Sequence, residues 1–204
     1  MDMSSKTPGS KDLSRGPLIG VLALQGAFIE HIGKLNELGF STVELRCALD
    51  LTSNRLDGLV LPGGESTVQM KLLHELGMFE PLKALIESGV PVLGTCAGLI
   101  LLASSVEGQS QVGFGTMPVV VRRNAYGRQL GSFHTTAPFE GVGDVPMTFI
   151  RAPYVTAVGD GVQVLSKVDG NIVAVRYGSQ YGLSFHPELD DGHWVYDLVF
   201  GRLR

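Results

Sequence analysis

The chain has few cysteines, few charges and no long apolar run. Its 204 residues include two cysteines, which are too few for a disulfide framework and do not stand in a spacing typical of zinc sites. We therefore expect a reducing compartment, the cytoplasm, and neither a metal nor another cofactor. No apolar run approaches the roughly 20 residues that cross a bilayer, and residues 1–16 lack the apolar segment of a secretory signal. Neither a membrane protein nor a secreted protein is expected.

Charged residues make up 18% of the chain, and the formal net charge is −4. A nucleic-acid-binding surface needs a basic stripe, and the densest basic spot is the pair Arg122 and Arg123. Nucleic acid is therefore not an expected partner. Glycine, in contrast, is abundant with 27 residues and follows no collagen repeat. This abundance indicates many turns and close backbone approaches.

Short apolar runs alternate with segments of helical spacing in the first half of the chain. The expected strands are residues 18–24, 42–46, 58–61 and 91–94. The expected helices are residues 28–38, 66–76, 81–87 and 97–103, with Ser66 as the N-terminal cap of the second. This alternation predicts a three-layer α/β/α fold with a mostly parallel central sheet. In such a sheet, sites form beyond the carboxyl ends of the strands.

The second half consists of short β-like runs separated by glycine, proline or aspartate. These runs are residues 118–122, 148–150, 162–167, 171–177 and 180–185, and a helix is expected at about 192–203. We expect this half to add antiparallel strands to the same sheet, with hairpin turns at residues 170–171 and 177–180. Residues 1–16 are expected to form a flexible tail. Residues 17–204 are expected to form a single domain, because no linker-like segment divides them.

Residues 94–98 read Gly-Thr-Cys-Ala-Gly where an expected strand meets an expected helix, which is the cysteine form of a nucleophile elbow. The nucleophile of an elbow stands on a tight, strained turn, and side chains two residues to either side would collide. The helix N-terminus after Cys96 favours a thiolate. Most free cysteines, however, are small buried apolar residues. Cys47, which follows an expected strand with no helix start behind it, is interpreted in that way.

A thiol nucleophile needs a base and a third group that orients the base. His186 directly follows an expected strand in the segment Phe-His-Pro-Glu, and Glu188 lies two residues on, on the same side of an extended chain. Glu188 could accept the ring N–H and fix the tautomer. Alone, His-Pro-Glu is also compatible with an ordinary turn, but together with Cys96 it supplies all three roles of a triad. The other histidines are interpreted as solvated or surface positions: His31, His74, His134 and His193.

Acyl transfer develops negative charge on a carbonyl oxygen, so backbone N–H donors must point at that oxygen. Residues 61–66, Leu-Pro-Gly-Gly-Glu-Ser, end one strand and open a helix. The paired glycines let the backbone turn its N–H groups towards a ligand. We expect the N–H groups of Gly64 and Ala97 to form the oxyanion hole. A phosphate-binding loop is the rival interpretation, but no Gly-Lys-Ser/Thr follows.

These motifs, in this order and spacing, resemble the class I (triad) glutamine amidotransferases. Further segments are similar to one family within them, the glutaminase subunits of pyridoxal 5′-phosphate synthase. They are Leu-Gln-Gly-Ala at 24–27, Leu-Pro-Gly-Gly-Glu-Ser-Thr at 61–67, Gly-Thr-Cys-Ala-Gly-Leu at 94–99, Arg-Asn at 123–124 with Gly-Arg-Gln at 127–129, Phe-Ile-Arg-Ala-Pro at 149–153 and Phe-His-Pro-Glu-Leu at 185–189. The resemblance covers residues 18 to about 203.

The resemblance implies hydrolysis of L-glutamine to L-glutamate and ammonia. Cys96 would attack the side-chain amide and form a glutamyl thioester. His186, oriented by Glu188, would protonate the leaving ammonia and then activate water. A substrate with an α-carboxylate and an α-ammonium group needs opposite charges and backbone donors. The glutamine-binding residues implied by the family pattern are Gly64, Glu65, Ser66, Arg123, Ile150 and Arg151.

The resemblance also implies a protein partner, the barrel-shaped synthase subunit, in a complex of twelve synthase and twelve glutaminase subunits. Docking activates the glutaminases of this family, and the region around Gln25 lies near that contact. The synthase joins the ammonia to a pentose phosphate and a triose phosphate. The chain departs from the family pattern at His134, where an acidic residue is expected, in its 16-residue leader and in the glycine-rich segment 140–146.

Three alternatives stay open at this point. The same triad would serve a glutaminase subunit of another synthase, such as one of the imidazole glycerol phosphate or purine pathways. A cysteine hydrolase or stress protein of the related fold would place its histidine close to the nucleophile in sequence, whereas His186 lies 90 residues after Cys96. A non-catalytic regulatory protein would have no need of a complete triad.

Overall fold

The computed structural model of the chain describes residues 16–109, 113–123 and 131–204. Residues 1–15 of the expected tail lie outside the described residues, as do Asn124 and the segment 127–129. The first half contains β1 (Leu18–Leu22), α1 (Phe28–Glu37), β2 (Ser41–Leu45), α2 (Ala48–Ser53), β3 (Gly58–Leu61), α3 (Ser66–Glu75), α4 (Phe79–Glu87), β4 (Val92–Thr95) and α5 (Ala97–Leu102). The second half contains β5 (Ala103–Val106), β6 (Met117–Arg122), β7 (Ser132–Phe139), β8 (Gly143–Ile150), β9 (Tyr154–Val158), β10 (Gln163–Val168), β11 (Asn171–Tyr177), β12 (Gln180–Leu183), η1 (Pro187–Leu189), α6 (Trp194–Phe200) and η2 (Gly201–Leu203).

A ten-stranded mixed sheet forms the central layer, in the order β2-β1-β3-β4-β12-β11-β9-β6-β5, with β10 paired to β11. The neighbours from β2 to β12 run parallel, whereas β11 is antiparallel to β9, β10 and β12. Strands β3, β4 and β12 are buried along their whole length, as expected for parallel strands covered on both faces. The predicted α/β fold, a mostly parallel sheet with antiparallel strands in the C-terminal half, is confirmed.

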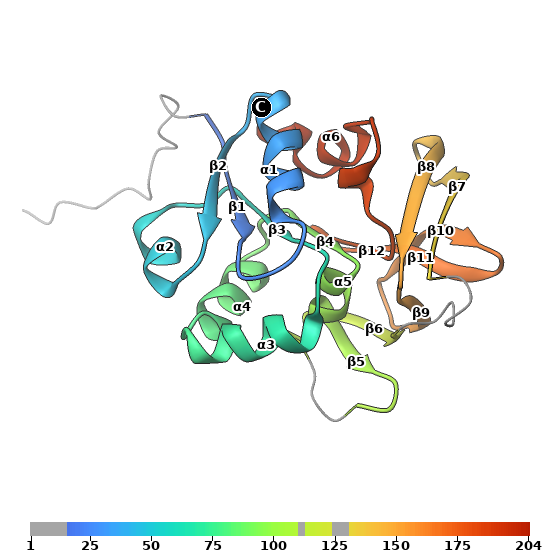
Figure 1. Cartoon of the computed structure of the whole chain (residues 1–204), viewed down its shortest axis with the longest axis horizontal. Coiled ribbons are helices and arrows are strands. Elements are labelled where there is room, and N and C mark those ends of the chain that lie inside the picture. Colours follow the sequence, from blue (N-terminus) through green and yellow to red (C-terminus); the bar gives the residue numbers. More distant parts are fainter. Residues whose placement is uncertain (1–15, 110–112, 124–130) are drawn as a thin grey trace, which may run out of the picture.

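Two apolar cores lie on opposite faces of this sheet. One core joins α1, α6, β7 and β8 to the sheet through residues such as Leu35, Phe149 and Tyr196. The other joins α3, α4 and α5 through residues such as Leu73 and Leu82. Figure 1 shows α1 and α6 above the sheet and α3 and α4 below it. The fold therefore has three layers, and the loops that follow the parallel strands β3, β4 and β12 leave the same edge of the sheet.

The second half differs from the prediction in its strands, and the predicted runs do not include β5, β7 or β9. Strands β7 and β8 pair only with each other, as a separate two-stranded sheet, so residues 148–150 do not extend the central sheet. Strand β12 runs parallel to β4 rather than antiparallel to its neighbour in the first half. The hairpin turn at residues 177–180 is confirmed by the pairing of Tyr177 with Gln180. The other turn lies at Asp169 and Gly170, one residue earlier than expected.

Two predictions about helix starts in the first half are wrong. Glu65, not Ser66, is the N-cap of α3, and Ser66 is the first helical residue, buried and without a capping hydrogen bond. Cys47 does have a helix behind it, because it is the N-cap of α2. The carboxylate of Asp50 accepts the Cys47 N–H at 2.9 Å and its thiol at 3.4 Å, which forms a capping box. Cys47 therefore has a structural role at this helix end.

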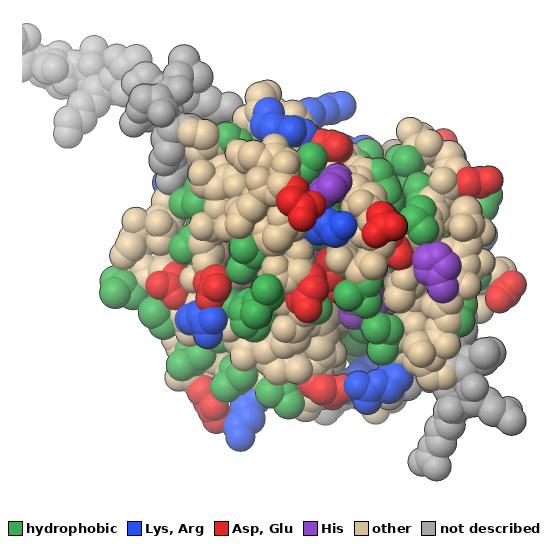
Figure 2. Space-filling model, turned by 45° about the horizontal axis from the view of Figure 1, so that its top comes forward, with side chains coloured by type: hydrophobic (Ala, Val, Ile, Leu, Met, Phe, Trp, Pro, Cys, Tyr) green, Lys and Arg blue, Asp and Glu red, His purple; other side chains and the backbone are tan. Residues whose placement is uncertain are grey.

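The surface carries both signs of charge. On the face seen in Figure 2, acidic and basic side chains are interspersed. No helix within the described ranges is long and apolar enough to span a membrane.

Candidate active site

The backbone makes a strained turn at Cys96, between the end of β4 and the start of α5. Cys96 has φ 48° and ψ −98°, and its N–H donates to the Leu183 carbonyl of β12 at 2.7 Å. A Cβ on Gly98 would lie 1.9 Å from the Leu61 carbonyl oxygen, and one on Gly94 would lie 2.9 Å from the Gly98 backbone. The glycines thus permit the close approach that the elbow requires, as the sequence pattern predicts.

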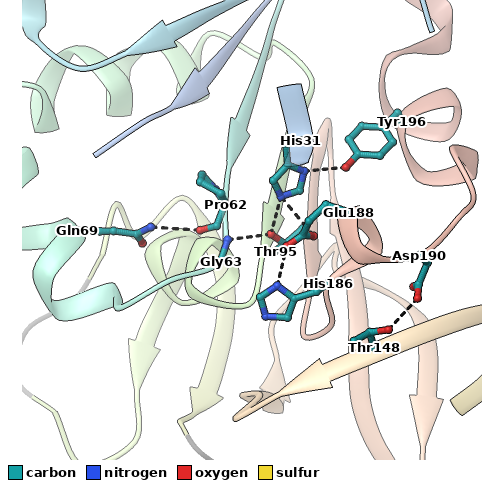
Figure 3. Close-up of polar contacts among 10 residues, drawn as sticks. All are labelled: His31, Pro62, Gly63, Gln69, Thr95, Thr148, His186, Glu188, Asp190 and Tyr196. Carbon is teal, nitrogen blue, oxygen red and sulfur yellow. Dashed lines mark hydrogen bonds and ion pairs between the residues drawn. The ribbon is translucent and has the colours of Figure 1, made fainter. Parts of the chain in front are cut away.

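His186 and Glu188 lie just beyond the end of β12, the strand next to the elbow. The Nδ1 atom of His186 is 2.7 Å from Oε1 of Glu188 (Figure 3), and both side chains are buried. The His186 N–H donates to the Thr148 carbonyl at 2.8 Å, so β8 of the small sheet fixes the backbone here. The first turn of η1 brings Glu188 back towards the imidazole.

The charges of this pair support each other. Although burial opposes the charged imidazolium, hydrogen bonds with Cys96 and Glu188 raise the pKa of His186 above its ordinary value. Burial likewise opposes the Glu188 carboxylate, but the hydrogen bond from His186 and the charge of its imidazolium keep the pKa of Glu188 below its ordinary value. The arrangement therefore stabilises a protonated imidazole held by an ionised carboxylate, next to a thiol.

A pocket of about 140 Å³ opens in front of these side chains. Cys96 and His186 lie in its wall together with every residue that the sequence assigned to glutamine binding: Gly64, Glu65, Ser66, Arg123, Ile150 and Arg151. The prediction did not include three further lining residues: Gln25, Ile100 and Pro153. The volume suits a ligand of amino-acid size rather than a large cofactor.

The pocket contains both signs of charge. The Arg123 guanidinium donates to the Thr67 hydroxyl at 3.0 Å and lies 3.6 Å from a Glu65 carboxylate oxygen. Arg151 has a positive φ of 45°, which is uncommon for a residue with a side chain, and its N–H donates to the Gly131 carbonyl. A zwitterionic ligand could thus meet both a carboxylate and guanidinium groups in this pocket.

The glycine loop after β3 lies directly against the histidine. A Cβ on Gly63 would lie 2.3 Å from the His186 ring, and one on Gly64 would lie 2.5 Å from the Gln25 side-chain oxygen. That oxygen accepts the Glu65 N–H at 2.7 Å, while the Gly63 N–H donates to the Thr95 hydroxyl at 3.1 Å.

Ala97 is the first residue of α5, so its N–H precedes the first intrahelical acceptor. The N–H groups of Gly64 and Ala97 remain the predicted oxyanion hole, since Ala97 directly follows Cys96 and Gly64 lines the same pocket as Cys96.

The interpretation of His31 as a solvated helix residue is wrong. His31 is completely buried, and its ring nitrogens face Tyr196, Thr95 and Glu188. Its spacing from Leu35, one helical turn further on the buried face of α1, is the signal that could have revealed this position. His74 and His134 are exposed and His193 is partly exposed, as predicted.

The sequence of the chain matches a family model over residues 21–203, that of the SNO glutamine amidotransferase family. The chain belongs to the SNO glutamine amidotransferase family. One similar protein is "Pyridoxal 5'-phosphate synthase subunit PdxT" of Desulfitobacterium hafniense (strain Y51). It is 58% identical over 185 residues, which cover 91% of this chain and 92% of that protein. The protein of the same name from Methanocorpusculum labreanum is 60% identical over 87% of this chain and 93% of its own length.

Solved structures support the same assignment to the glutamine amidotransferases. The structure described as "Crystal structure of glutamine amidotransferase" superposes with a TM-score of 0.85 at 39% identity, over 91% of this chain and 98% of that chain. A putative GMP synthase subunit from Thermoplasma acidophilum superposes with a TM-score of 0.67 at 19% identity, over 93% of this chain and 94% of that chain, which shows a shared fold alone.

Proposed function

We propose that this member of the SNO glutamine amidotransferase family is the glutaminase subunit of a pyridoxal 5′-phosphate synthase. It hydrolyses L-glutamine to L-glutamate and ammonia. One observation carries the proposal: the elbow cysteine and His186, whose ring is held by Glu188, line one small pocket that bears both signs of charge. The relatives that match most of the chain carry the name of this synthase subunit. The imidazole glycerol phosphate and purine alternatives have no comparable support.

Catalysis begins when the Cys96 thiolate attacks the side-chain carbonyl carbon of glutamine. The carbonyl π electrons move to oxygen, and the N–H groups of Gly64 and Ala97 stabilise the oxyanion. The His186 imidazolium then donates its proton to the amide nitrogen as the C–N bond breaks, so ammonia leaves and a glutamyl thioester remains. His186, now neutral, takes a proton from water, and the resulting hydroxide attacks the thioester. Glutamate and the Cys96 thiolate are released.

The groups of the pocket wall divide the recognition of glutamine between them. Arg123 and Arg151 supply positive charge for the α-carboxylate, and Glu65 supplies negative charge for the α-ammonium group. Ile150 lies against the methylene groups of the substrate, and Gly64 and Ser66 leave room for its backbone atoms. Because Arg123 and Glu65 lie 3.6 Å apart without ligand, glutamine exchanges one ion pair for two.

The ammonia passes to a synthase partner, since free ammonia would be protonated in water before it could act as a nucleophile. We assign the partner as the barrel-shaped synthase subunit, in a complex of twelve and twelve subunits in the cytoplasm. The chain's cysteines are unpaired, as a reducing compartment would leave them.

The test is a glutaminase assay on the chain alone and with the co-expressed synthase subunit. We expect glutamate release in the complex, and pyridoxal 5′-phosphate formation with glutamine as nitrogen source. Cys96→Ala abolishes both activities, whereas Cys47→Ala, a matched change at the α2 cap, retains them. Glutamate release that depends on a different synthase, or pyridoxal phosphate formation that persists in Cys96→Ala with glutamine alone, would contradict the proposal.

A further inference from the structure

A fully buried histidine lies behind the triad, on the side away from the pocket. His31 of α1 contacts three elements at once: its Nδ1 atom is 2.8 Å from the Tyr196 hydroxyl of α6, and its Nε2 atom is 3.2 Å from the Thr95 hydroxyl at the end of β4. The same Nε2 atom lies 3.4 Å from Oε2 of Glu188 (Figure 3). As far as the described residues define the pocket, His31 lines no part of it. The mechanism above does not use this residue.

The two carboxylate oxygens of Glu188 face two different histidines. Its Oε1 atom accepts from His186, whereas Oε2 is buried and has no hydrogen bond of standard geometry among the described residues. A buried carboxylate oxygen without a donor is costly, on the order of 1–3 kcal/mol or more. His31 Nε2 faces this atom, so a small adjustment of the ring completes the carboxylate's second hydrogen bond.

The surroundings of His31 select one tautomer. Burial is the main cause that lowers the pKa of His31, partly offset by the Glu188 carboxylate, so the ring is neutral and carries one N–H. Burial and the Glu188 charge raise the pKa of Tyr196, so its hydroxyl stays protonated and can donate to Nδ1. A carboxylate only accepts, so the tautomer that can bond Glu188 is the one with its N–H on Nε2. The opposite tautomer would place two lone pairs face to face at Glu188.

We propose that His31 is a positioning residue of the glutaminase reaction: its Nε2–H holds the Glu188 carboxylate so that Oε1 stays directed at the Nδ1 atom of His186. This inference rests on the proposed function.

The same contacts link the triad to the oxyanion loop. Thr95 Oγ1, next to His31 Nε2, accepts the N–H of Gly63. Its side chain is buried at the residue directly before the nucleophile. One imidazole therefore spans the carboxylate of the triad and the hydroxyl that fixes the glycine loop. A purely structural core position between α1 and α6 would be filled more cheaply by an apolar side chain, because each buried polar group costs free energy unless it is paired.

Two variants of similar size separate the positioning role from packing. Glutamine and methionine have similar length and volume, but only glutamine carries an N–H that can reach Glu188. We expect His31→Met to lower kcat by about tenfold or more, as for loss of support to a general base, with KM changed by less than about twofold because the pocket wall is intact. We expect His31→Gln to keep kcat within about threefold of the wild type by the same argument.

The assay uses the chain in complex with its synthase, and it is accompanied by thermal unfolding of each variant. His74→Gln, at an exposed position of α3, is the control for the substitution itself. Equal kcat values for His31→Met and His31→Gln, or a loss that appears in KM alone, would overturn the inference. If the wild type releases no glutamate, the proposed function fails instead, and the two failures are thus distinguishable.

A measurement on the unmodified protein covers the case in which His31→Met does not fold. Long-range ¹⁵N–¹H NMR spectra report which imidazole nitrogen carries the proton. For His31 we expect a neutral ring with its proton on Nε2 at about pH 8, above the ordinary histidine pKa of roughly 6.5. A neutral ring with its proton on Nδ1 would overturn the inference, because Nε2 would then have no proton to donate to Glu188.

Discussion

Replacement of Gly98 by alanine tests whether the elbow and the oxyanion loop form one packed unit. The added Cβ would lie 1.9 Å from the Leu61 carbonyl oxygen, and real Cβ atoms essentially never approach within 3.0 Å, so α5 and the end of β3 must separate by more than 1 Å. The two nearest atoms, the carbonyl oxygen and carbon of Leu61, belong to the backbone, which cannot rotate away as a side chain could. The residues that follow Leu61 form the glycine loop, so the shift reaches Gly63 and Gly64.

The expected effects have two magnitudes. Overpacking of this kind costs about 1–3 kcal/mol of unfolding free energy. A displacement of roughly 1 Å between catalytic groups can lower the rate about 100-fold. Chemical denaturation measures the first, and the rate at which a glutamine-analogue electrophile labels Cys96 measures the second without needing the synthase.

Gly33→Ala is the matched control. Gly33 lies within α1, is exposed and has no atom within 4 Å of an added Cβ. We expect this change to stabilise the protein by about 0.5–1 kcal/mol, since alanine is the better helix former, and to leave labelling unchanged. The reasoning is refuted if Gly98→Ala unfolds at the wild-type denaturant concentration and labels Cys96 at the wild-type rate.

Three further predictions follow from the site. Glu188→Gln keeps the side-chain volume but removes the carboxylate that fixes the tautomer of His186, so kcat should fall by about 10⁴-fold with little change in KM. Steady-state kinetics of the complex would contradict this role of Glu188 if kcat fell by less than about tenfold. The pKa of His186 is raised partly by its hydrogen bond with Cys96, so in Cys96→Ala its NMR titration should move to lower pH than in the wild type; an unchanged midpoint would contradict the coupling. A raised pKa in the folded state stabilises the protein at pH values below the unfolded-state pKa, and this stabilisation is lost as the pH rises through the folded-state pKa. The free energy of unfolding of the wild type should therefore decrease towards alkaline pH more than that of Cys96→Ala. Denaturant titrations at several pH values would measure this difference.

The parts of the site that depend on local sequence could be predicted. Gly94 and Gly98 indicate the elbow because a side chain at either position would collide with neighbouring backbone atoms. His186 and Glu188 are two residues apart, and the hydrogen bond between them needs only a strand end and one turn. The parallel half of the sheet is predictable as well, since β1, β3 and β4 are short, mostly apolar runs next to glycine or proline.

The parts that depend on tertiary packing could not be predicted in the same way. The charged neighbours Glu30 and Lys34 favour a solvated position for His31, yet the packing of α1 against α6 and β4 decides which face is buried. The separate sheet of β7 and β8 has the same alternating pattern as a strand of the central sheet, so periodicity alone cannot assign its partner. Helix α2 is six residues long and none of its residues is buried, so no apolar face in the sequence indicates a helix behind Cys47.

The most direct measurement is the mass of the covalent intermediate. The complex of the chain with its synthase is mixed with L-glutamine, quenched in acid within the turnover time, digested and analysed by mass spectrometry. We predict an adduct equal to glutamine minus ammonia on the peptide that contains Cys96, and no adduct in Cys96→Ala. Glutamate release without this adduct, or an adduct on Cys47, would contradict the assignment of Cys96 as the nucleophile.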